Sequence, residues 1–107
     1  FDYLHLTTPA MLLKYYNILT EINADSNSSF FDVTAQLLDK YKKNKQDIYI
    51  DCIKFFLEIK FHKKTFSTKN ITSLFETKNG ILKILYEYQK FNLSNNSVLN
   101  FVKNSIN

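Results

Sequence analysis

The sequence predicts an all-α fold, a compact bundle of about five helices with an extra helix at the N-terminus. Apolar residues recur at spacings of three and four along most of the 107 residues, which is the periodicity of helices with one buried face. Gly and Pro occur once each, too few for the turns of a many-stranded sandwich or barrel. Hydrophobic residues make up 45% of the chain, so a domain of this length has enough apolar surface for one core.

The first predicted helix spans about residues 9–23. Thr8 is a suitable N-cap, and Pro9 fits the first helical position because an N–H there would lack a partner in any case. Apolar residues follow at helical spacing: Met11, Leu12, Tyr15, Ile18, Leu19 and Ile22. The small polar residues 23–29 predict a flexible connection. We therefore expect an accessory N-terminal helix and connection at residues 1–28 and a helical bundle at residues 29–107.

Ser29 and Asp32 predict the start of the second helix, because their spacing matches a variant of the capping box. One face of this helix is apolar and consists of Phe30, Val33, Leu37, Leu38 and Tyr41. The lysines near residue 43 suit the negative end of the helix dipole, so the helix is expected to end there. A short polar connection is predicted at about residues 42–46.

The third predicted helix follows Asp47, which can act as its N-cap, and it is apolar almost all round. Its apolar residues are Ile48, Tyr49, Ile50, Cys52, Ile53, Phe55, Phe56, Leu57 and Ile59. The polar residues form one narrow stripe, expected to be solvated and salt-bridged, of Asp51, Lys54, Glu58 and His62. A buried strand competes for residues 48–50, but the spacing of the polar residues favours a helix. We expect this helix to be central, with neighbours on most of its circumference.

The C-terminal third predicts three further helices, for a total of six. Ser67 can cap a short helix that is ended by Asn79 and Gly80, since Gly adopts the left-handed conformation at little cost. The apolar residues of this helix are Ile71, Leu74 and Phe75. The next helix spans about residues 81–91, with Ile81, Leu82, Ile84, Leu85 and Tyr88. After the polar residues 92–96, the last helix is indicated by Val98, Leu99, Val102 and Ile106.

Charge and cysteine content narrow the class of protein. The net charge is +4, and all 14 positive side chains are lysines. Arginine binds phosphate and guanine bidentately, so its absence makes nucleic acid a permitted but secondary partner. A single cysteine cannot form an internal disulfide, and no apolar run reaches the roughly 20 residues of a membrane span. We expect a soluble intracellular domain with no membrane partner, cut from a longer protein because the chain starts at Phe1 without methionine.

The residues that catalysis or metal binding requires are not grouped in this sequence. His5 and His62 are far apart, and with one cysteine a structural zinc site is close to excluded. Cys52 lies on the most apolar helix, where a cysteine is expected to be a small core residue with an inert thiol. One glycine cannot form a phosphate-binding loop. We therefore expect no enzyme, no cofactor, and no catalytic, cofactor-binding or metal site.

Several short motifs resemble the TFIIS N-terminal domain family, which includes the integrase-binding domain of LEDGF. The first motif is the apolar helix DCIKFFLEI at residues 51–59, followed by Thr68 and Ile71. The others are Glu76-Thr77-Lys78 before Gly80-Ile81 and Ile84, and the phrase QKFNL at residues 89–93. With the order and lengths of the last five helices, they extend the resemblance over about residues 30–107. The family's tryptophan is absent, and Tyr86, Glu87 and Tyr88 stand where it has basic residues.

The resemblance implies a right-handed bundle that acts as a monomeric, non-enzymatic adaptor in a nuclear transcription-elongation or chromatin-associated factor. Its partners would be short disordered motifs of transcription or chromatin proteins, each with an aromatic or apolar anchor and acidic flanks. Two interhelical loops at one end of the bundle would form the site, with Lys45, Gln46, Asp47, Phe91 and Leu93. Lys42, Lys43 and Lys90 would attract the acidic flank. Two structural alternatives stay open, that Asp47 is only an N-cap and that Phe91 only closes the helix against the core.

Two other functions are consistent with the sequence. A basic helical module could bind nucleic acid phosphates through Lys40, Lys42, Lys43, Lys45, Lys60, Lys63 and Lys64, although such runs are more often a solvated face. A self-association or docking module could instead cover a partner with exposed aromatics near the N-terminus, namely Phe1, Tyr3, Tyr15 and Tyr16.

Overall fold

The computed structural model describes residues 8–67 and 71–106, with the side chains of 8–62 and 73–105. This part of the chain forms five helices and no strand: α2 (Pro9–Glu21), α3 (Phe30–Asn44), α4 (Ile48–Ser67), α5 (Ile71–Phe91) and α6 (Asn95–Ile106). The predicted all-α class is confirmed.

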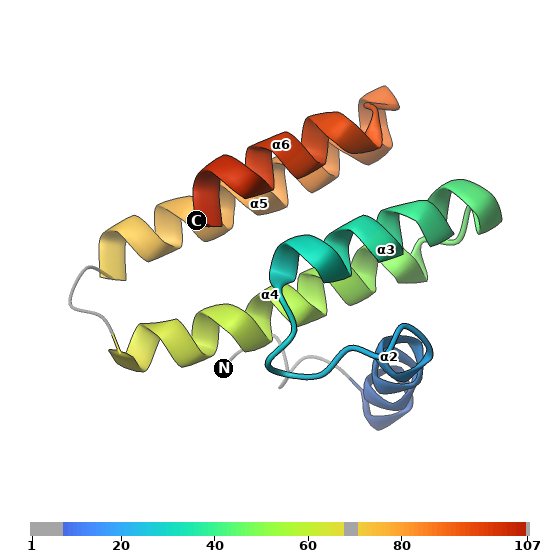
Figure 1. Cartoon of the computed structure of the whole chain (residues 1–107), viewed down its shortest axis with the longest axis horizontal. Helices are drawn as coiled ribbons and strands as arrows, with labels where there is room; N and C mark the ends of the chain where they lie inside the picture. The colour runs from blue at the N-terminus through green and yellow to red at the C-terminus, as the bar shows by residue number, and fades with distance from the viewer. Residues whose placement is uncertain (1–7, 68–70, 107) are drawn as a thin grey trace.

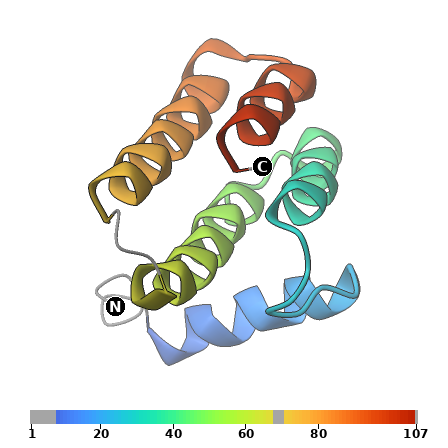
Figure 2. The same ribbon diagram turned by 60° about the vertical axis from the view of Figure 1, so that its left-hand side comes forward.

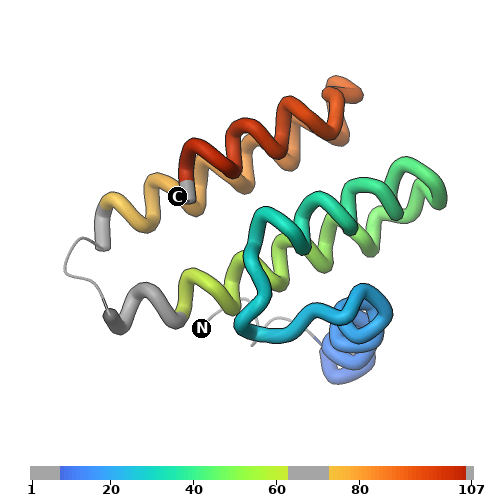
Figure 3. Tube along the Cα trace, viewed as in Figure 1, coloured from blue at the N-terminus to red at the C-terminus, as the bar shows by residue number. Residues whose placement is uncertain are grey.

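Helices α3 to α6 form an up-down-up-down bundle, in which each helix runs antiparallel to the next (Figures 1 and 3). α3 packs against α4, α4 against α5, α5 against α6, and α6 closes the bundle against α3. This alternation places the α3–α4 turn and the α5–α6 turn at the same end, on the right in Figure 1. We call this end the tip, which consists of the two turns, residues 45–47 and 92–94, and of the helix ends that flank them, residues 42–44 and 89–91. The fold thus brings together two turns that are far apart in the sequence.

Helix α4 is central, as the sequence predicted. It packs against α2, α3 and α5, and α2 crosses its outer side in Figure 2. Its buried residues are Ile50, Cys52, Ile53, Phe55, Phe56, Leu57 and Phe61. The polar stripe is half-buried rather than solvated, and Glu58 pairs with Lys78 of α5. The stripe therefore also joins two helices.

Local signals fix the helix ends. The Thr8 hydroxyl accepts a hydrogen bond from the Met11 N–H at 3.2 Å, and the Ser29 hydroxyl accepts one from the Asp32 N–H at 3.4 Å, so both predicted N-caps are confirmed. After α3 the chain turns through Lys45 with φ of 55°, a left-handed conformation. These ends set the short turn that leads into α4.

The N-terminal helix shares the core of the bundle. Tyr15, Ile18 and Leu19 of α2 are buried, and the Tyr15 ring stacks on Phe55 of α4 with 5.0 Å between ring centroids. The connection to α3 is held by Lys60, whose ammonium donates to the Ser26 carbonyl oxygen at 3.0 Å. Packing of α2 and the other helices is therefore continuous through one hydrophobic cluster.

The prediction of a helix end at Asn79 and Gly80 is wrong. α5 continues through both residues, and no glycine has a positive φ. A Cβ added to Gly80 would lie 3.1 Å from Cζ of Phe101, so the glycine serves the close approach of α6 to α5. Ser67 likewise does not directly precede a helix, because it is the last residue of α4. The described residues therefore form five helices instead of the six that the sequence predicted.

Gly80→Ala is expected to raise the free energy of unfolding by about 0.5 kcal/mol, since a helix-interior glycine costs up to about 1 kcal/mol and the partly exposed Phe101 ring can shift slightly. Urea unfolding followed by circular dichroism measures the change. Gly80→Val should be destabilising, because its larger side chain meets the ring. A loss of more than about 1 kcal/mol for the alanine variant would show instead that the Phe101 ring cannot shift and that α6 requires glycine at this position.

Thr34→Val is expected to raise the free energy of unfolding by about 1 kcal/mol, because an unsatisfied buried hydroxyl costs about 1–3 kcal/mol. Thr34 is fully buried on α3, and its hydroxyl has no hydrogen-bond partner among the described residues. Thr77→Val is the matched control, since the Thr77 hydroxyl donates to the Ser73 carbonyl at 3.0 Å. Equal effects of the two changes in urea unfolding would refute a penalty specific to Thr34.

Candidate partner-binding site

A hydrogen bond at the tip joins the α3–α4 turn to the end of α5. The Gln89 side-chain amide donates to the Asp47 carboxylate at 3.2 Å, and this bond links the α3–α4 turn to the last turn of α5. The Asp47 carbonyl also accepts from the Asp51 N–H at 3.0 Å, as the residue before α4 should. Asp47 therefore lies at the start of α4 and also connects this helix to α5 through Gln89.

A second set of contacts holds three helices together beside the tip. The Tyr88 hydroxyl donates to the Asn95 side-chain oxygen at 2.6 Å, and the Asn95 amide donates to the Asp39 carboxylate at 3.1 Å. The Tyr88 ring lies 5.8 Å from the Tyr41 ring and 5.5 Å below the Lys42 ammonium. Burial, with smaller contributions from Tyr41 and Asp39, raises the pKa of Tyr88 to about 12. These contacts fix α3, α5 and α6 relative to one another.

Tyr88→Phe is expected to lower the free energy of unfolding by about 1 kcal/mol, because Asn95 loses a short hydrogen bond. The raised pKa means that the folded state favours the protonated phenol, a contribution present below pH 10 and lost between pH 10 and about 12. Urea unfolding at neutral pH and near pH 11 should show a smaller gap between wild type and variant at high pH. Tyr86→Phe, at an exposed tyrosine, is the control and should change neither value.

Phe91 is exposed at the end of α5. Its exposed fraction is 61%, so it does not simply close the helix against the core. Leu93 is half-buried and packs against the core, so part of its role is structural. The Lys90 ammonium lies 5.5 Å from the centroid of the Phe91 ring and 5.4 Å from that of Tyr86. Phe91 thus belongs to an exposed group of two rings and one cation.

The tip residues surround the end of α5 instead of facing one another. Gln89 points to the α3–α4 turn, where it meets Asp47. Phe91 is two residues further on, which is about 200° around a helix, so it faces the other side of α5. Lys45 and Gln46 are exposed on the α3–α4 turn. A partner that touches both Phe91 and this turn must therefore pass across the end of α5.

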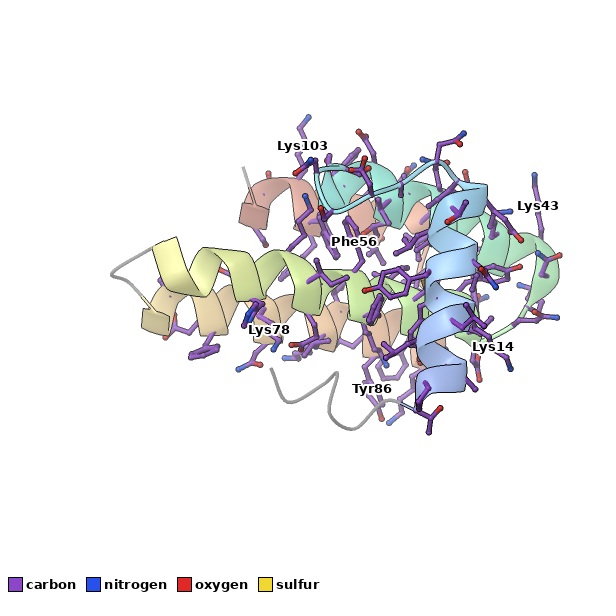
Figure 4. The ribbon with its side chains drawn as sticks, turned by 90° about the horizontal axis from the view of Figure 1, so that it is seen from below. Lys14, Lys43, Phe56, Lys78, Tyr86 and Lys103 are labelled. Atoms are coloured by element: carbon purple, nitrogen blue, oxygen red, sulfur yellow. The ribbon has the colours of Figure 1, made fainter. Side chains whose placement is uncertain are left out.

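The tip is basic. Lys43, Lys45 and Lys90 are exposed and Lys42 is half-buried, and none of the four forms an ion pair within the described part of the chain. Figure 4 shows Lys43 projecting from the molecule. Lys60 lies elsewhere, bonded to Ser26. The predicted lysine set for nucleic acid is therefore not one surface, and the side chains at 63 and 64 lie outside the described residues.

Sequence reasoning missed the roles of Tyr86 and Gln89. Tyr86 stands four residues before Lys90, a spacing that places both on one helix face, and this signal could have revealed the pair. The aromatic surface predicted near the N-terminus is only partly present, because Tyr15 is buried while Tyr16 is exposed. Phe1 and Tyr3 lie outside the described residues.

Metal-ligating side chains do not gather in the described residues. These residues contain no cluster of three or more His, Cys, Asp and Glu side chains that could hold a metal ion. Cys52 is buried, and burial, with a smaller contribution from Asp51, raises the pKa of its thiol to about 12. The prediction of an unreactive core cysteine agrees with this. None of the described helices is long and apolar enough to cross a membrane.

No protein-family model, curated protein or solved structure matches this chain. The resemblance to the TFIIS N-terminal domain family therefore stays a prediction from the sequence motifs.

Proposed function

We propose that this chain is a protein-interaction domain whose tip binds short disordered segments with an aromatic or apolar anchor and acidic flanks. The observation that carries the proposal is an exposed Phe91 at the tip, an end of the bundle whose four lysines have no ion-pair partner among the described residues. An exposed aromatic side chain is a typical anchor of binding energy in protein interfaces. The resemblance to the TFIIS N-terminal domain family supports a parent protein that acts in transcription elongation or on chromatin in the nucleus.

The two parts of the surface have different physical roles. The Phe91 ring offers apolar area whose burial drives binding. The lysines attract acidic segments and favour a rapid encounter, an effect that falls with ionic strength. The bundle beneath is held by the Asp47–Gln89 bond and the Tyr88 contacts, so little of the domain has to become ordered on binding. A disordered partner pays most of the ordering cost.

The proposal is tested by titrating the chain with a synthetic peptide that carries one phenylalanine flanked by glutamates. Isothermal titration calorimetry should detect binding that weakens with added salt. A peptide with glutamines in place of the glutamates, and one with alanine in place of phenylalanine, are the matched controls and should each bind more weakly. No binding of the first peptide at low salt would refute the proposal. Binding of DNA or RNA at low salt with no peptide binding would favour the nucleic-acid function instead.

A further inference from the structure

The outer face of α5 near the tip carries a cation that lies close to two exposed rings. The Lys90 ammonium lies 5.4 Å from the Tyr86 centroid and 5.5 Å from the Phe91 centroid. Tyr86 is 57% exposed and Phe91 is 61% exposed, and Figure 4 shows Tyr86 projecting outward while Phe56 lies inside the bundle. None of the three side chains belongs to the buried core. Their arrangement is therefore not explained by the packing of the fold.

We propose that Tyr86, Lys90 and Phe91 form a carboxylate-binding subsite, in which Lys90 pairs with an aspartate or glutamate of the partner and Tyr86 positions the ammonium. This inference rests on the proposed function and names the group that the partner must present. Charge complementarity supports the choice of partner, because Lys90 is an exposed cation with no ion pair within the described residues. Glu87 lies three residues before Lys90, a spacing that permits a salt bridge. The ammonium nevertheless lies over the rings.

The position of Lys90 lowers the cost of pairing with a partner. A free lysine loses much rotamer freedom when an ion pair fixes it, which is one reason why exposed ion pairs contribute little. Two rings that already attract the ammonium restrict it before the partner arrives. The adjacent Phe91 ring can at the same time contact an apolar side chain of the same segment.

Three variants test this subsite by calorimetry with the glutamate-flanked and glutamine-flanked peptides. Lys90→Gln is expected to lower the affinity for the glutamate-flanked peptide about fivefold and to reduce the preference for glutamate over glutamine. Tyr86→Leu, which keeps an apolar helix-forming residue, is expected to weaken binding about threefold. The double variant should bind no more weakly than Lys90→Gln alone, because Tyr86 acts through Lys90.

Lys83→Gln is the matched control, since Lys83 is an exposed lysine of the same helix. It lies about 10 Å from Lys90 along the helix axis, on the side away from the tip. This variant should leave the affinity within about twofold of wild type, since this separation is close to the Debye length. Multiplication of the two single losses to about fifteenfold in the double variant would overturn the inference. Equal losses from Lys83→Gln and Lys90→Gln would overturn it as well. An unchanged glutamate preference after Lys90→Gln overturns the subsite alone, whereas no binding by the wild type overturns the proposed function too.

Discussion

Phe56→Ala is expected to lower the free energy of unfolding by about 3–5 kcal/mol, the usual cost of removing a large buried ring. Phe56 is 1% exposed at the centre of α4. Its ring is nearly parallel to that of Phe30 on α3, with 6.3 Å between centroids, and the Lys60 ammonium lies 5.4 Å from its centroid. Alanine leaves a cavity between the two helices and releases Lys60, which also holds the α2–α3 connection through Ser26.

Urea unfolding followed by circular dichroism measures this loss. Domains of this size have a stability of roughly 5–15 kcal/mol, so the variant should be marginal or partly unfolded at room temperature. Phe75→Ala is the matched control, because it removes the same ring from an exposed position of α5, and it should change the stability by less than about 1 kcal/mol. Similar losses for the two variants would contradict the central position of α4.

Phe91→Ala is expected to lower the affinity for the glutamate-flanked peptide by at least about tenfold, the size of effect typical for an aromatic anchor of an interface. The exposed ring lies at the end of α5, so its loss should lower the free energy of unfolding by less than about 1 kcal/mol. The circular dichroism spectrum should not change. The variant thus separates the binding role of the ring from any role in folding.

Calorimetry for affinity and thermal melting for stability check this prediction together. Phe75→Ala again provides the control, because it also removes an exposed ring from α5 but lies far from the tip along the helix. It should leave the affinity unchanged. A large drop in melting temperature for Phe91→Ala would make the ring part of the core, and an unchanged affinity would remove it from the binding surface.

Much of the fold could be predicted because its signals are local. Thr8 and Ser29 cap helices through bonds to residues three positions ahead, so the sequence alone contains both partners. The apolar residues of α4 cover most of its circumference, and only a central helix can bury such a surface. The predictions were wrong where the structure depends on a contact with a residue that is distant in the sequence. The local sequence around Gly80 is typical of a helix end. In the structure the helix continues, and Gly80 lies against Phe101 of α6, a contact that the local sequence does not reveal.

The site was harder to predict than the fold. The sequence motifs pointed to both turns of the tip, and the antiparallel order of the helices brings those turns together. The direction of each side chain could not be predicted, because it depends on where α5 ends relative to its neighbours. Phe91 and Asp47 consequently lie on different sides of the same helix end. The contact of Tyr86 could not be predicted from the resemblance either, because the family has a basic residue at this position, whereas the Tyr86 ring lies 5.4 Å from the Lys90 ammonium.

A titration of the isotope-labelled chain with the glutamate-flanked peptide, followed by amide nuclear magnetic resonance, locates the binding surface. Binding at the tip predicts shifts confined to the residues near 42–47 and 86–93, with the core amides of α4 unchanged. Shifts centred instead on the exposed face of α2, near Leu13 and Tyr16, or spread over the whole bundle, would contradict it.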